Sequence, residues 1–134
     1  HYNLVFRSEY ESDMAPAVDK LGLSVASYFS LASGFLTGKY ATAQDIEGAA
    51  RKAGVSSYDS PQARTVLAKV AEIAQAHSVD SATVALAWLL TRAHVDAPIA
   101  SARVVSQLPA LMAAARIQLS ADEVAGLTSA SNGL

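Results

Sequence analysis

The sequence contains no cysteine, few charged residues and no long hydrophobic run. The absence of cysteine excludes disulfides and thiolate metal sites, and it fits a cytoplasmic protein. Charged residues make up 16 % of the chain, and its ten lysines and arginines form no basic run. We therefore expect neither a nucleic-acid partner nor an anionic membrane surface as partner. No apolar stretch is long enough to span a bilayer.

The chain does have enough length and apolar content for one domain, since 51 % of its 134 residues are hydrophobic. Much of this excess is alanine, which favours close helix packing. The sequence opens on His1-Tyr2-Asn3-Leu4, without methionine and without the polar lead that natural termini usually have. We therefore expect a fragment of a longer protein, with part of its apolar surface covered by the missing part.

Capping residues and apolar spacing predict the helices. Ser60-Pro61 opens the clearest one, because a capping serine followed by proline is a typical helix start. Ser120 and Glu123 have the spacing of a capping box that opens a final helix ending near residues 132–133. Three more helices are expected, namely residues 13–20 between Ser12 and Gly22, an apolar helix after Asp80 that holds Trp88 in the core, and residues 106–116.

The remaining apolar stretches predict strands at residues 23–29 and 98–101, and the remnant of another at residues 1–7. Residues 30–60 show no sustained period, so we expect a long loop without regular structure on the ligand side of the first full strand. The alternation indicates an α/β fold with two to three strand–helix units. A closed β/α barrel needs eight, so the chain is a piece of a (β/α)8 TIM barrel or a smaller open sheet.

Several segments in register carry a resemblance to a known family. Residues 28–40, Tyr-Phe-Ser-Leu-Ala-Ser-Gly-Phe-Leu-Thr-Gly-Lys-Tyr, are similar to the Y-[SY]-P-L-A-x-G-x-L-T-G-K-Y stretch after the seventh strand of aldo-keto reductases. Residues 1–7 resemble the end of the sixth strand, and residues 84–90 and 97–108 resemble the helix, the eighth strand and the next helix. Residues 119–123 resemble the closing L-S-A-E-E motif. The resemblance implies a single barrel domain over residues 1–134, limited to about strands 6–8, with residues 30–60 as the cofactor-side loop.

The resemblance also implies an enzyme that binds NADP(H) and reduces aldehydes and ketones. Tyr28 would lie against the nicotinamide ring, Lys39 would reach a phosphate, and Arg103 would hold the 2′-phosphate. Hydroxyls and glycine-exposed amides suit a pyrophosphate, and a guanidinium suits a phosphate dianion. The expected cofactor-binding residues are Tyr28, Phe29, Ser30, Leu31, Ser33, Gly34, Lys39, Ser101, Arg103 and Gln107.

The chain departs from the family pattern at four positions. Ser30 replaces the usual proline and Ser101 replaces a common glycine, while Ala110 and Leu111 replace the acidic residue and asparagine that often hold adenine. These departures leave the adenine contacts and the choice between NADPH and NADH open.

No residue of the chain matches the catalytic aspartate, tyrosine, lysine and histidine of the family, so no catalytic residue is assigned and the chain alone is expected to be inactive. The histidines, His1, His77 and His94, have no metal-ligand spacing and are expected at the surface, without a metal. Two alternatives stay open. The chain could be a non-catalytic nucleotide-sensing or scaffold module, and open sheet edges would make an isolated fragment self-associate.

Overall fold

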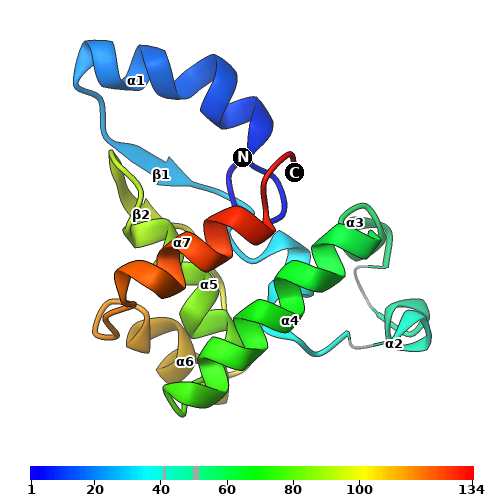
Figure 1. The fold of residues 1–134 in the computed structure, drawn as a ribbon. Coiled ribbons are helices and arrows are strands. Elements are labelled where there is room, and N and C mark those ends of the chain that lie inside the picture. Colours follow the sequence, from blue (N-terminus) through cyan, green and yellow to red (C-terminus); the bar gives the residue numbers. More distant parts are fainter. Residues whose placement is uncertain (41, 50–51) are drawn as a thin grey trace.

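The computed structural model describes residues 1–40, 42–49 and 52–134. It is a helix-rich α/β arrangement with a parallel sheet of two strands (Figure 1). The elements in chain order are a π-helical turn Tyr10–Met14 (η1), α1 Ala15–Leu21, β1 Val25–Ser27, a 3-10 turn Ala32–Thr37 (η2), α2 Ala43–Glu47, α3 Lys52–Ser56, α4 Pro61–Ala76, α5 Ser81–Leu90, β2 Val95–Pro98, a 3-10 turn Val105–Gln107 (η3), α6 Leu108–Ala113 and α7 Ala121–Ala130.

The sheet consists of β1 and β2, which lie side by side and run parallel. Val25 pairs with Val95 and Ser27 pairs with Pro98, and one more hydrogen bond joins Ile99 N to Ser27 O at 2.7 Å. The predicted strand at residues 98–101 therefore begins three residues too late. The physical reason is that Val95 is buried opposite Val25, a pairing that the local sequence does not reveal.

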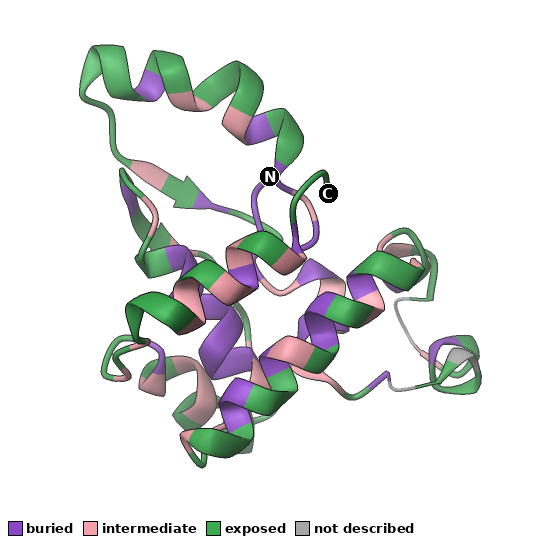
Figure 2. Cartoon of the chain, in the orientation of Figure 1, coloured by how far each residue is buried: buried purple, intermediate pink, exposed green. Residues whose placement is uncertain are grey.

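The core is centred on α5, whose side chains are buried nearly all round (Figure 2). Trp88 is fully buried there, as predicted. Helices α4 and α7 pack against this region and against each other, and α4 contributes apolar residues at helical spacing. Asp80 stands at the predicted N-cap of α5, although its side chain makes no capping hydrogen bond.

Two helix starts were predicted correctly. The Ser60 side chain accepts a hydrogen bond from Ala63 N at the start of α4. Ser120 and Glu123 form the complete capping box of α7. The backbone hydrogen bond from Ser120 lowers the pKa of Glu123, and His77 at the end of α4 lies 2.8 Å from the same carboxylate. This contact joins α4 to α7.

The first helix begins earlier than residues 13–20, and Ser12 does not cap it. Ser12 lies inside η1, and its hydroxyl donates to Asp13. The first amides of the helix are instead satisfied by the far end of the chain, because Leu134 O accepts from Arg7 N at 2.8 Å and Ser8 N at 2.7 Å. Gly22 ends α1 in a left-handed conformation, as its position predicted.

Residues 30–60 are not a structureless loop, and that prediction was wrong. They contain η2, α2 and α3. Thr42 caps α2 through a capping box with Asp45, and the buried side chains of Ile46 and Val55 anchor α2 and α3. Single apolar anchors in helices of five residues leave no period for a sequence pattern to detect.

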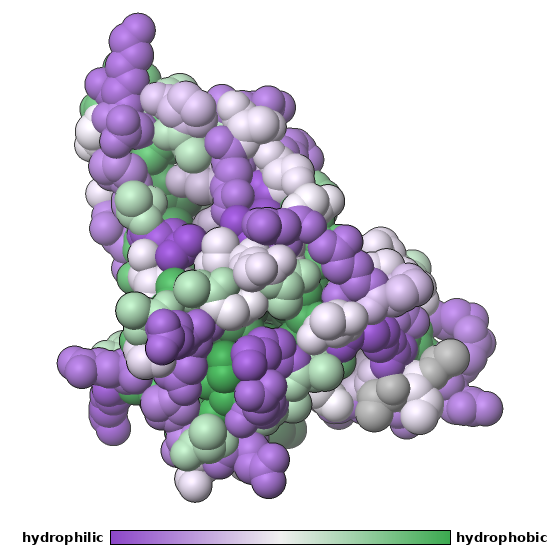
Figure 3. Space-filling view, viewed as in Figure 1, coloured by the Kyte–Doolittle hydropathy of each residue, from purple (hydrophilic) through white to green (hydrophobic). Residues whose placement is uncertain are grey.

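Two further predictions need correction. Residues 1–7 form no strand but a tight turn with one antiparallel bridge between Asn3 and Phe6. The helix predicted at residues 106–116 is shorter, because η3 occupies its first turn and α6 ends at Ala113. Within the described residues no helix is long and apolar enough to cross a membrane. The face seen in Figure 3 is mixed, with apolar side chains visible between hydrophilic ones.

Candidate functional site

Two loops leave the carboxyl ends of β1 and β2 at the same edge of the sheet. The first is residues 28–34, directly after Ser27, and the second is residues 99–107, directly after Pro98. The hydrogen bond from Ile99 N to Ser27 O holds the starts of the two loops together. All the predicted cofactor-binding residues except Lys39 lie on these two loops, at the edge where parallel sheets bind ligands.

The first loop has an unusual backbone. Three non-glycine residues in it have positive φ, namely Phe29 (53°), Ala32 (50°) and Ser33 (56°), and Gly34 follows at 100°. Only two other non-glycine residues in the described part of the chain share this property. Strained backbone of this kind is concentrated at functional sites, so it marks residues 29–34 as a candidate.

The side chains of this loop divide into exposed and supporting ones. Tyr28 and Phe29 are each 50 % exposed, although large aromatic rings are usually buried. Ser30 is buried, and its hydroxyl donates to Ser27 O at 2.9 Å, so it supports the turn from beneath. Ser33 and Leu31 are half-buried. The loop thus presents two aromatic faces above a hydrogen-bonded turn.

Lys39 lies next to Gly34 although it is five positions away. A side chain added at Gly34 would place its Cβ 3.3 Å from Lys39 Cε, so the glycine leaves room for the lysine to cross the turn. The Lys39 ammonium lies 4.8 Å from the centre of the Tyr40 ring. An ammonium beside strained amides is a favourable environment for an anion.

The second loop is open to solvent. Ser101, Arg103 and Gln107 are all exposed, and Arg103 N donates to Gln107 Oε1 at 2.8 Å. The Gln107 side chain therefore holds the backbone at Arg103, while the Arg103 residue stays exposed. Ala110 belongs to α6 and accepts from Thr83 through its carbonyl, so this position offers adenine no polar side chain.

Sequence reasoning missed the segment that packs beside the first loop. The imidazole of His1 stacks on Phe6 with 3.9 Å between ring centres, lies within 5.4 Å of the Tyr28 and Phe29 ring centres, and bonds Tyr58 Oη at 2.8 Å. His1 is thus half-buried, not a surface residue as predicted. Burial also raises the pKa of Tyr58. These rings meet from three separate segments, and no local pattern signals that.

Comparison with known proteins agrees with the motifs. The sequence profile of the aldo/keto reductase family matches residues 1–132. The chain belongs to this family. It is 32 % identical to an aldo-keto reductase of Fusarium vanettenii over 92 % of its own length, which is 33 % of that protein. It is also 32 % identical to the uncharacterized oxidoreductase YrpG of Bacillus subtilis (88 % of the chain, 35 % of that protein) and 29 % identical to the protein tas of Escherichia coli (92 % and 36 %).

The chain spans about a third of the length of these relatives. The described residues contain no group of three histidine, aspartate or glutamate side chains that could hold a metal ion.

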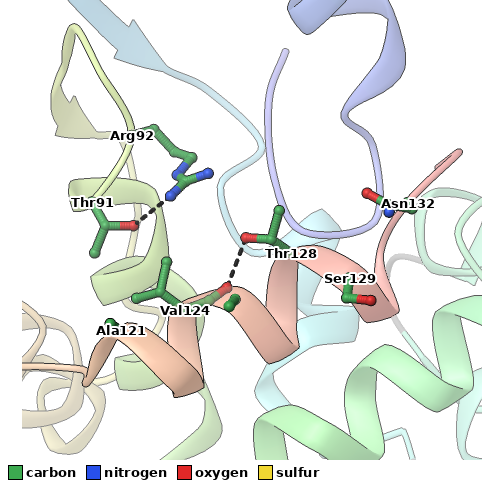
Figure 4. Close-up of a pocket in the computed structure, with 8 residues that line it drawn as sticks. Thr91, Arg92, Ala121, Val124, Thr128, Ser129 and Asn132 are labelled. Carbon is green, nitrogen blue, oxygen red and sulfur yellow. Dashed lines mark hydrogen bonds between the residues drawn. The ribbon is translucent and has the colours of Figure 1, made fainter.

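An open hollow of about 570 Å³ lies elsewhere on this aldo/keto reductase chain (Figure 4). Thr91 and Arg92, which line it, precede β2 in the chain, so the hollow lies toward the amino end of that strand. It is lined by Thr91, Arg92, Ala121, Val124, Ala125, Thr128, Ser129 and Asn132, which include none of the predicted cofactor-binding residues. Because ligands in parallel sheets bind beyond the carboxyl ends of the strands, we assign the candidate site to the two loops.

Proposed function

We propose that this chain supplies the cofactor-binding part of an NADPH-dependent oxidoreductase that reduces aldehydes and ketones to alcohols. In this proposal residues 1–134 form the C-terminal units of one (β/α)8 barrel, about strands 6–8 with their helices. Membership of the aldo/keto reductase family supports the oxidoreductase class. The single observation that carries the cofactor role is the pair of loops at one sheet edge, one strained and aromatic, the other exposed and basic.

The residues present fit a dinucleotide. Tyr28 offers a half-exposed ring for the flat nicotinamide. The amides of Ala32 and Gly34 already donate within the turn, so the amides of Leu31 and Ser33, with the Ser33 hydroxyl and Lys39, offer the donors for the pyrophosphate. Arg103 offers a guanidinium for the 2′-phosphate, with Ser101 and Gln107 beside it. When bound, the cofactor supplies a hydride. The chain's own residues bind and orient it.

The test is a fluorescence titration of the purified chain with NADPH and NADH, in the native form and with Arg103→Gln. We expect Arg103→Gln to weaken NADPH binding about tenfold or more and to change NADH binding little, because only NADPH carries the 2′-phosphate. Arg116→Gln is the matched control, since Arg116 is exposed and lies outside both loops. No binding of either nucleotide, or equal losses in the two variants, would contradict the proposal.

A second experiment separates an enzyme from a sensing or scaffold module. We expect no NADPH oxidation by this chain with an aldehyde substrate, because none of its residues matches the family's catalytic set. The assay is then repeated on a longer protein that contains these residues. Turnover there supports the reductase, whereas NADPH binding without turnover supports the non-catalytic module that shares the same nucleotide loops.

A further inference from the structure

Asn3 lies outside both loops but contacts the first one directly. It is fully buried, its Nδ2 donates to Phe29 O at 3.0 Å, and its Oδ1 accepts from Val5 N at 2.9 Å. Both polar atoms of the side-chain amide, the donor and the acceptor, therefore make a hydrogen bond. A carboxylate of the same size would offer acceptors only, and a leucine would offer neither function.

Phe29 is the residue that needs this support. Its φ of 53° is a genuine outlier for a bulky side chain, and such conformations persist only when the surroundings over-determine them. Two donors converge on its carbonyl, namely Asn3 Nδ2 from another segment and Ala32 N at 2.7 Å from within the loop.

The same segment also holds the residue before it. Tyr2 N donates to Tyr28 O at 3.4 Å, so the carbonyls of Tyr28 and Phe29 are both fixed by residues 2 and 3. The two aromatic rings nevertheless remain half exposed. The direction of the Tyr28 ring is thus determined by backbone contacts, because its own side chain is only partly packed.

We infer that Asn3 is a positioning residue for the nicotinamide platform. By holding Phe29 in its left-handed conformation, it fixes the turn that presents the Tyr28 ring. The inference rests on the proposed function, since Tyr28 is a platform only when a nicotinamide cofactor binds.

The experiment compares NADPH with 2′,5′-ADP, a probe that has the adenosine end but no nicotinamide. In Asn3→Leu we expect NADPH binding to weaken about tenfold and 2′,5′-ADP binding to stay unchanged. In a Phe29→Gly background, whose own NADPH affinity is the reference, Asn3→Leu should cost little further affinity, because glycine adopts positive φ without strain and no longer needs the amide. Thr128→Val is the control. It removes a hydroxyl on α7, outside both loops, that accepts a hydrogen bond from Trp88 Nε1 on α5.

A ligand-free measurement accompanies the titrations. The melting temperature should fall more when Asn3→Leu is made in the native chain than when it is made in Phe29→Gly. Equal falls in melting temperature would overturn the positioning role, and so would a loss of NADPH affinity on Asn3→Leu that is as large in Phe29→Gly as in the native chain. If the native chain binds neither ligand, the proposed cofactor function fails, and the melting temperatures still decide whether Asn3 holds Phe29.

Discussion

Helices α5 and α1 occupy equivalent places in the chain, since each leads into a strand of the sheet, but their burial is very different. Eight of the ten residues of α5 are buried, whereas α1 buries only Val18 among its seven (Figure 2). The α5 side chains are covered by α4, α6, β2 and the 3-10 turn η2. Near α1, Met14, Leu21 and Leu23 are 56 %, 66 % and 49 % exposed.

This difference separates a self-sufficient region from a dependent one. Most side chains of α5 are buried by the described residues alone. The arm formed by residues 10–27 (η1, α1 and β1) presents apolar side chains that the described residues leave about half exposed or more. In a family whose relatives are about three times longer than this chain, we propose that a segment outside these 134 residues covers this arm.

The largest expected loss of stability comes from creating a cavity in the buried region around α5. Leu89→Ala removes a fully buried side chain from α5, and we expect a loss of about 2–5 kcal/mol in the free energy of unfolding. Leu21→Ala in α1 should change it by less than about 0.5 kcal/mol, because Leu21 is exposed. Urea unfolding measures both. Similar losses at the two positions would mean that α1 is packed as firmly as α5.

The next largest loss of stability is expected from breaking the contact that joins the arm to the core. Glu11 accepts from Arg7 Nε and Nη2 and from Tyr2 Oη, and Arg7 is buried against Trp88. Glu11→Gln leaves this arginine without its counterion, so we expect a loss of about 1–3 kcal/mol at pH 7 in urea unfolding, with partial solvent screening toward the lower figure.

This contribution depends on pH. Burial alone would raise the pKa of Glu11, but hydrogen bonds from Arg7 and Tyr2 outweigh it and lower the pKa below its usual 4.5. A lowered folded-state pKa gives stability that is complete above 4.5 and is lost as the pH falls through the folded value. The difference in unfolding free energy between the native chain and the variant should therefore shrink as the pH falls below 4.5. A difference that stays constant with pH would exclude this carboxylate as its source.

Two serines, Ser120 at the start of α7 and Ser12 in the arm, allow the same comparison with a smaller expected change in stability. Ser120→Ala removes a capping hydrogen bond from α7, and we expect a loss of about 1 kcal/mol. Ser12→Ala should have almost no effect, because the Ser12 hydroxyl bonds only its neighbour Asp13 at the surface. Thermal unfolding followed by circular dichroism measures both. A larger effect at Ser12 would indicate that the π-helical turn depends on it.

The smallest effect on stability is expected from making the arm polar. Met14→Ser combined with Leu21→Ser should change the free energy of unfolding by less than about 0.5 kcal/mol. We expect the native chain to self-associate through its exposed apolar arm, and the double variant to do so less. Sedimentation velocity over a range of micromolar concentrations tests this. A native chain that stays monomeric throughout would contradict it.

Local signals made much of the fold predictable. Ser60-Pro61 and the Ser120–Glu123 box sit within one turn of the helices they start, so the sequence alone was sufficient for α4 and α7. Contacts between distant residues were not predictable in this way. Strand β2 is placed by the pairing of Val95 with Val25, 70 positions away in sequence, and α2 and α3 are anchored by single buried residues.

The candidate site shows the same division. The Tyr28–Tyr40 motif indicated the first loop, and Arg103 with Gln107 indicated the second, although their cofactor roles remain predictions. The motif could not indicate Asn3, His1 or Tyr58, because they reach the loop from other segments. Nor did it indicate that the Ser30 hydroxyl is turned inward, since only the folded turn reveals its bond to Ser27.

The bond between Leu134 O and the first helix has a consequence for the order of folding. Arg7 and Ser8 find this acceptor about 126 positions later, and Arg7 also donates to Thr128 O and Ser131 Oγ. Closing so long a chain segment is slow compared with forming a local helix. During synthesis, therefore, this helix precedes α4, α5 and α7 but gains its cap only after all three have been made.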